Sequence, residues 1–212
     1  MAALLYCVVE AEAPEIALPA GLAGAVVRAT DFDGLRAFHS EVDVAELSAA
    51  GQQRALEFHR VVAAVFAEVA TISFRFPTVF ATEQEMTEHL QPKAAVMAAF
   101  LRQRRDEVEM EIRIAGAPLA AAGEAPSGAE YLRRRAEHGR DLERAADAIR
   151  CCAALRDWRQ RAAGDGLRCY ALLLRGDVAN WRAAVADAHL PAGVRAVVSG
   201  PWPANEFLEL GA

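Results

Sequence analysis

The sequence contains no long apolar run. Hydrophobic residues make up 54% of its 212 positions, but no uninterrupted apolar stretch approaches the roughly 20 residues that cross a bilayer. Residues 1–9 are apolar, yet no basic region precedes them, and Glu10 and Glu12 follow. This pattern predicts a first β-strand and no signal peptide, so we expect a protein without a membrane span.

Basic residues are also fewer than acidic residues. The chain carries a formal net charge of −6, whereas binding to nucleic acid requires a local excess of lysine and arginine. The basic run at 133–135 lies among acidic residues such as Glu130 and Glu137, which predicts a salt-bridged helix surface. Nucleic acid is therefore not an expected partner.

The chain lacks the residue spacings that mark metal and catalytic sites. Cys7, Cys151, Cys152 and Cys169 include no C-x-x-C pair, and no histidine lies at a ligand spacing from them. We therefore expect reduced thiols and no metal site. Nucleotide-binding and hydrolase motifs such as G-x-G-x-x-G and G-x-S-x-G are absent. The sequence predicts no cofactor and no catalytic residues.

Two alternative hypotheses stay open. A small α/β enzyme of unrecognised type would bring His59, Arg75 and the carboxylates of Glu107–Glu111 around a pocket. A regulatory α/β module would bind a small ligand at its sheet. Against the first hypothesis, the alternation within 107–114 favours a strand whose glutamates form a solvated face.

Periodicity predicts a mixture of strands and helices. Alternating or β-branched runs predict strands at 4–9, 25–29, 35–42, 71–76, 107–114, 167–174 and 194–198. Apolar residues at intervals of three or four predict helices over 52–70, from Thr82 towards Arg104, and over 178–189. Thr82 is the expected N-cap of its helix, with Glu85 completing a capping box.

The second half carries a long charged segment. Residues 115–128 are rich in alanine, glycine and proline, which predicts a linker. From 129 to about 163, apolar residues keep helical intervals within a charged surface, which predicts a long helix or a helical hairpin. We therefore expect an α+β protein with an N-terminal domain over 1–114 and a C-terminal α+β domain over 115–212.

Three segments carry a resemblance to a known family. They are 59–80, ending Ile-Ser-Phe-Arg-Phe-Pro-Thr-Val-Phe, then 128–132, Gly-Ala-Glu-Tyr-Leu, and 199–203, Ser-Gly-Pro-Trp-Pro. Together with the order of elements, these segments resemble the GvpL/GvpF family of gas vesicle proteins over essentially the full chain. The family pattern has proline where Ser73 stands and glycine where Pro77 stands, so the chain resembles a divergent member.

The resemblance implies both a fold and a role. It implies a ferredoxin-like N-terminal α/β domain, followed by an α+β domain that contains a coiled-coil-like helical segment. It also implies a non-catalytic, cytoplasmic and gas-vesicle-associated accessory protein. Such a protein would bind the hydrophobic shell subunit, or other accessory proteins, during gas vesicle assembly.

Four residues in the matching segments are the expected partner contacts. Phe74 and Phe76 are expected on the packed side of strand 71–76, while Arg75 lies on its polar side. From there Arg75 could form a charge-assisted hydrogen bond to a partner or to an internal carboxylate. Trp202, between two prolines, offers a large apolar surface with one N–H donor, either for docking or for closing the core.

Overall fold

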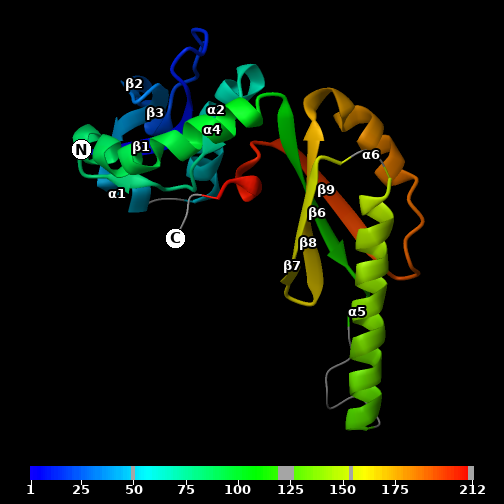
Figure 1. Cartoon of the computed structure of the whole chain (residues 1–212). Coiled ribbons are helices and arrows are strands. Elements are labelled where there is room, and N and C mark those ends of the chain that lie inside the picture. Colours follow the sequence, from blue (N-terminus) through cyan, green and yellow to red (C-terminus); the bar gives the residue numbers. More distant parts are fainter. Residues whose placement is uncertain (49–50, 119–126, 153–154, 210–212) are drawn as a thin grey trace. The chain divides into compact units, whose positions relative to one another are not determined.

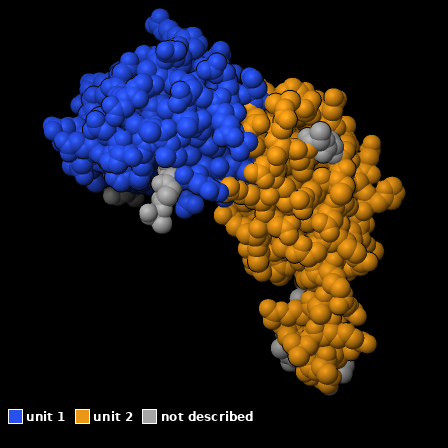
Figure 2. Space-filling model, in the orientation of Figure 1, with its two compact units in different colours: residues 1–106, 203–212 blue, residues 107–202 orange. Residues whose placement is uncertain are grey.

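The chain folds into two units (Figure 2), and each unit is built on one antiparallel β-sheet. A computed structural model describes residues 1–48, 51–118, 127–152 and 155–209. The first unit contains residues 1–106 and the C-terminal segment from Pro203, and the second contains residues 107–202. The architecture is therefore α+β, as the sequence predicts.

The division between the units differs from the predicted boundary at residue 114. The strand over 107–115, assigned from sequence to the first domain, belongs to the sheet of the second unit. The chain also returns to the first unit after Trp202. Both differences arise from pairing between distant segments, which local composition does not encode.

A central strand, β1, organises the first unit (Figure 1). The elements are β1 (Ala2–Glu10), β2 (Arg28–Phe32), β3 (Leu35–Val42), α1 (Val44–Ser48), α2 (Gln52–Glu68), β4 (Ile72–Ser73), β5 (Val79–Phe80), α3 (Glu83–Leu90) and α4 (Ala94–Gln103). The strand order is β2-β3-β1-β4, and β5 also pairs with β1. Because α2 packs on one face of the sheet, and α3 and α4 on the other, β1 is buried almost throughout.

The second unit places two helices on one face of its sheet (Figure 1). Its elements are β6 (Glu107–Ala115), α5 (Gly128–Arg150), β7 (Asp157–Ala163), β8 (Gly166–Leu174), α6 (Val178–Ala186) and β9 (Arg195–Trp202), in the strand order β7-β8-β6-β9. Alternate residues of β6 and β8, such as Ile112 and Ala171, pack with Leu142 of α5 and Trp181 of α6. This apolar layer forms the core of the unit.

The predicted start of the third helix is confirmed. Thr82 is the N-cap of α3, and its side chain accepts a hydrogen bond from the Glu85 N–H at 3.1 Å. Glu85 in turn accepts one from the Ala81 N–H at 2.8 Å. Pro92 lies in a 3-10 turn that separates α3 from α4, so the predicted helix towards Arg104 is divided in two.

The strand predicted over 71–76 is much shorter. Only β4, Ile72–Ser73, is regular, and the Phe74 N–H still bonds to the Tyr6 carbonyl at 3.0 Å. Beyond it the Thr78 hydroxyl donates to the Arg75 carbonyl at 2.7 Å. That turn ends the pairing before the alternation in the sequence ends.

The prediction of a long helix reaching about residue 163 is wrong in its second part. Helix α5 ends at Arg150, and residues 157–163 form strand β7 against β8. Cys152 and Leu155, which continue the helical spacing, are partly buried against the same core. The spacing of these two residues reflects their packing against the core and not a continuing helix. No helical hairpin forms in the described residues of this region.

The prediction that the glutamates of 107–114 form a solvated face is also wrong. Glu109 is buried at 5% exposure, and the side chains of Glu107 and Glu111 are only 13% and 16% exposed. Neighbouring guanidinium groups compensate the charge, because Glu111 contacts Arg113 at 2.9 Å and Arg168 at 3.1 Å. The carboxylates therefore belong to an ion-paired face.

Among the described residues, no helix combines the length and apolar character needed to cross a bilayer.

Candidate functional site

Strand β2 forms an outer edge of the first sheet. It has β3 on one side, and no strand pairs with its other side in the part of the chain that the structure describes. Most of its residues are exposed. An edge of this kind presents backbone N–H and C=O groups that can pair with another chain.

A shallow groove of about 440 Å³ runs beside this edge, where the loop before β2 approaches the sheet. Its lining combines apolar and charged side chains and consists of Pro14, Glu15, Ile16, Leu18, Val27, Ala29, Asp31, Arg36 and Phe38. Ile16, Leu18 and Val27 are partly buried against the core beneath α2. The groove therefore offers apolar surface directly beside unpaired backbone.

Tyr6 fixes the loop that forms the wall of the groove. Its hydroxyl accepts a hydrogen bond from the Leu22 N–H at 2.9 Å and shares one with the Ser40 hydroxyl at 2.7 Å. Burial raises the pKa of this phenol. Gly21 allows the approach, because a Cβ there would lie 2.4 Å from the Tyr6 oxygen. The loop is thus held by β1.

A second anchor joins the same loop to α2. The Ala23 N–H donates to a Glu57 carboxylate oxygen at 3.0 Å, and Arg54 contacts that oxygen at 2.9 Å. The hydrogen bond from the Ala23 N–H makes the largest contribution to lowering the pKa of Glu57, and the hydrogen bond from Arg54 lowers it further. The groove wall is therefore tied to both the sheet and the helix.

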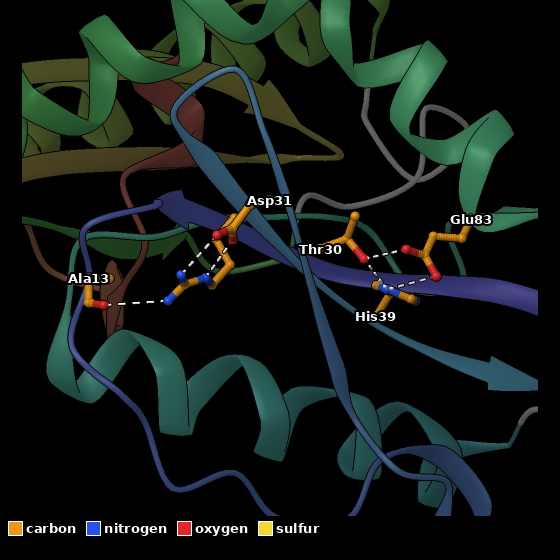
Figure 3. Close-up of polar contacts among 6 residues, drawn as sticks. Ala13, Thr30, Asp31, His39 and Glu83 are labelled. Carbon is orange, nitrogen blue, oxygen red and sulfur yellow. Dashed lines mark hydrogen bonds and ion pairs between the residues drawn. The ribbon is translucent and has the colours of Figure 1, made fainter.

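An ion pair lies at the polar end of the groove (Figure 3). Arg36 donates to both carboxylate oxygens of Asp31, at 2.7 and 3.0 Å, and reaches the Ala13 carbonyl at 3.5 Å. The hydrogen bond from Arg36 lowers the pKa of Asp31. Because the two charges compensate each other, this end of the groove adds no net charge.

A polar cluster lies on the opposite face of β2 and β3 (Figure 3). The Thr30 hydroxyl donates to Glu83 of α3 at 2.5 Å and lies 2.9 Å from Nε2 of His39. Since the Thr30 proton goes to the carboxylate, Nε2 of His39 is the donor in that second contact. Nδ1 of His39 is then an unprotonated, buried acceptor without a partner among the described residues.

Burial lowers the pKa of His39, and the nearby Glu83 carboxylate offsets this only in part. The cluster joins β2 and β3 to the N-terminus of α3. Strand β2 is thus anchored on both faces, while its outer edge stays unpaired among the described residues.

The four sequence-predicted contacts lie elsewhere. Phe76 packs against the first core and its ring lies 5.3 Å from that of Phe58, Phe74 is half-buried, and Arg75 is exposed. Trp202 ends β9 in the second unit, where it is half-buried and its Nε1 lies 3.4 Å from the Ser199 hydroxyl. None of the four lines the groove.

The proposed catalytic groups are not gathered within one unit. His59 and Arg75 are exposed in the first unit, whereas Glu107–Glu111 belong to the second. The described residues include no group of three or more side chains arranged to hold a metal. All four cysteines are free thiols, and burial raises the pKa of Cys169 to about 12.

Sequence reasoning missed the groove. The available signal was a pair of apolar residues, Ile16 and Leu18, inside a proline-containing loop, followed by Val27. Apolar residues in a loop mark a packed or binding segment, because a solvated loop gains nothing from them. What the spacing could not predict was which strand this loop would border.

Comparison with known proteins adds a second kind of observation. The family model described as gas vesicle synthesis protein GvpL/GvpF matches residues 2–209. The crystal structure of the gas vesicle protein GvpF from Anabaena sp. PCC7120 is similar, with a TM-score of 0.74 at 11% identity over 100% of this chain and 97% of that one. The crystal structure of the gas vesicle protein GvpF from Microcystis aeruginosa gives a TM-score of 0.73 at 14% identity, over 98% of this chain and 99% of that one. No curated protein matches.

Proposed function

The chain belongs to the GvpL/GvpF family of gas vesicle synthesis proteins, and from this premise we propose that it binds the small hydrophobic shell subunit during vesicle assembly. As a member of this family it is a non-catalytic gas vesicle protein, so the small-enzyme hypothesis is set aside. The binding partner and the binding surface are the proposal.

The observation that carries the proposal is the edge of β2, which no strand pairs with among the described residues, beside a groove lined in part by apolar side chains. A small hydrophobic shell subunit would aggregate through its apolar surface before assembly. An extended segment of that subunit can add to β2 by backbone hydrogen bonds while its side chains fill the groove. Because β2 is already held on both faces, little ordering accompanies binding.

Capture of the shell subunit tests this function. The chain is tagged and co-expressed with the shell subunit from the same genome, and the bound subunit is quantified. Leu18→Glu places a charge in the groove and should reduce capture by at least about tenfold, because a buried unpaired carboxylate is costly. Leu132→Glu, the same change at a leucine that is 63% exposed on α5, should leave capture intact.

The outcome is informative only for folded variants, which far-UV circular dichroism and thermal unfolding establish. Full capture by folded Leu18→Glu protein would refute the groove as the binding surface. Failure of the wild-type chain to capture the subunit would instead favour another gas vesicle accessory protein as its partner.

The sequence-predicted residues remain a second proposed contact. The exposed guanidinium of Arg75 and the half-buried ring of Trp202 can be removed by Arg75→Ala and Trp202→Ala. Phe74 and Phe76 accompany Arg75 but also contribute to packing. If either alanine variant stays folded and loses capture, the interface extends to that residue.

We also propose that the protein is cytoplasmic and associates with the vesicle. Its four free thiols support a reducing compartment. Separation of vesicles from lysate by flotation, followed by detection of the chain in both fractions, tests the association.

Both units are proposed as ferredoxin-like variants. The second unit supports this with the element order β6-α5-β7-β8-α6-β9 and the strand order β7-β8-β6-β9. The first unit has the corresponding strand order, β2-β3-β1-β4, but a 3-10 turn at Leu22–Gly24 replaces the first helix. That replacement leaves room for the groove-forming loop.

A further inference from the structure

Two rows of side chains lie side by side in the groove beside β2. Strand register places Ala29 opposite Phe38 and Asp31 opposite Arg36, and all four residues line the groove. The first row is apolar and the second is charged. Because residues that face each other across paired strands lie on the same face of a sheet, a strand added to the edge of β2 would continue both rows.

The charged row sets a preference for the side chain that comes to lie beside Asp31. Arg36 donates to both carboxylate oxygens of Asp31 from the β3 side (Figure 3), and this contact raises the pKa of Arg36. The Asp31 side chain is still 56% exposed, so its carboxylate can accept from an added strand as well. Opposite charges on facing strand positions are stabilising and like charges are destabilising, which favours a basic side chain at this position.

Glu15 adds a second carboxylate to the same groove. It is exposed and lines the groove, and its side chain has no hydrogen bond or ion pair with the described part of the chain. No basic residue precedes Arg28 in the sequence, and Arg28 itself lies 3.1 Å from Glu41. Since Arg36 is held by Asp31, the lining carries one net negative charge, that of Glu15.

We propose that the segment bound in the groove is a strand whose groove-facing residues are apolar except for one lysine or arginine beside Asp31, and that Glu15 selects for this basic side chain. The inference rests on the groove being the surface that binds the shell subunit. The apolar residues of the segment continue the row of Ala29 and Phe38. The basic residue gains charge-assisted hydrogen bonds from two carboxylates, whereas an acidic residue there would be repelled by both.

A second copy of this chain does not supply such a side chain. Arg28 is the one basic residue of β2, and it lies on the opposite face from Asp31 because side chains alternate along a strand. Two β2 strands paired about a two-fold axis keep their groove faces on the same side, so Arg28 of one copy cannot lie beside Asp31 of the other. Nucleic acid fits poorly as well, because Asp31 and Glu15 would repel a phosphate backbone.

Binding of labelled peptides to the full chain tests the proposal. The probes are three short peptides in which valine and threonine alternate, with one central valine replaced by lysine, glutamine or glutamate. Fluorescence anisotropy is measured at about 0.15 M salt, where attraction over more than about 8 Å is screened. The lysine peptide should bind about three- to tenfold more tightly than the glutamate peptide, with the glutamine peptide between them, because each exposed ion pair contributes only modestly.

Two variants in the same loop separate the effect of Glu15 from that of the general charge of the chain. Glu15→Lys should remove the preference for the lysine peptide and should bind the glutamate peptide more tightly than the wild type does, a gain that unfolding cannot produce. Glu12→Lys changes the net charge equally at an exposed residue that does not line the groove, and should keep the preference. Capture of the co-expressed shell subunit should fall at least about threefold in Glu15→Lys and stay unchanged in Glu12→Lys.

The outcomes distinguish this proposal from the function on which it rests. If Leu18→Glu weakens binding of the glutamine peptide but the wild type binds the lysine and glutamate peptides equally, the groove is the binding surface and the charge preference is wrong. The preference is also wrong if Glu12→Lys removes it as fully as Glu15→Lys does. If no peptide binds, or if Leu18→Glu leaves binding of the glutamine peptide unchanged, the groove is not the binding surface and both proposals fail.

Discussion

Single residues decide whether the groove beside β2 exists, and Tyr6 is the clearest case. Tyr6→Phe leaves the buried Leu22 N–H and the Ser40 hydroxyl without their shared partner. Loss of a buried partner costs about 1–3 kcal/mol, so we expect a decrease of that size in the free energy of unfolding measured with urea. Capture of the shell subunit should weaken as well, because the loop loses its anchor.

Tyr131→Phe, on the outer part of α5, is the matched control and should change neither quantity. Unchanged stability in Tyr6→Phe would mean that the loop is held by its other anchor, Glu57, and that Tyr6 contributes little.

His39 gives the first unit a pH dependence. Burial holds the pKa of His39 in the folded protein below its ordinary value of 6.5, although Glu83 and Glu41 act in the opposite direction. The unfolded chain therefore binds the proton more readily, so unfolding becomes easier as the pH falls below about 6.5. His39→Gln can still donate to Thr30 but does not titrate.

We expect the free energy of unfolding of the wild type to fall more steeply than that of His39→Gln between about pH 6.5 and 5. Urea titrations at closely spaced pH values measure the difference in slope. Parallel curves for the two proteins would contradict the assignment of a lowered pKa to His39.

At the scale of secondary structure elements, the start of α3 depends on its N-cap, because Glu85 accepts from the Ala81 N–H and not from that of Thr82, so the predicted capping box is incomplete. Thr82→Ala removes the acceptor for the Glu85 N–H and should cost about 1 kcal/mol, whereas Thr82→Ser should cost much less because serine caps equally well. Thermal and urea unfolding measure both. Equal losses in the two variants would show that the methyl group of Thr82, and not its hydroxyl, is what matters.

The same helix illustrates what sequence can predict. The Thr82 and Glu85 signal is local, so pattern alone located the start of α3, and the alternation within β6 (Glu107–Ala115) located that strand. Strand β7 was missed because its identity depends on pairing with β8, and the neighbouring Cys152 and Leu155 happen to continue a helical spacing. Long-range pairing overrode the local pattern.

The groove and the ion pairing of Glu111 were missed for a related reason. Ile16 and Leu18 meet β2 only after the loop is folded back by Tyr6. The contact between Glu111 and Arg168 requires the β6–β8 register, which no single segment encodes. The family resemblance, by contrast, rested on local motifs and was confirmed over residues 2–209.

At the scale of the whole molecule, the chain leaves the first unit at residue 106 and returns to it after Trp202. Asn205 attaches this returning segment to β4: its side chain accepts from the Ser73 N–H at 3.2 Å and donates to the Ser73 hydroxyl at 2.9 Å. Ala204 and Phe207 are buried alongside. The C-terminal segment thus completes the first unit.

Asn205→Ala should therefore destabilise the first unit by about 1–3 kcal/mol, the cost of unsatisfied polar groups. Hydrogen exchange should become faster in β4 and β1. All three tryptophans, Trp158, Trp181 and Trp202, lie in the second unit, so the tryptophan fluorescence transition should stay where it is. A shift confined to tryptophan fluorescence would contradict this assignment of the C-terminal segment.

The most direct test of the proposed shell-subunit site is hydrogen exchange of the chain with and without the co-expressed shell subunit. If the subunit adds to the edge of β2, the amides of Arg28–Phe32 and of the loop around Leu18 should exchange more slowly in the complex, because the unpaired N–H groups gain partners. A stable complex in which those amides exchange as fast as in the free chain would contradict the account.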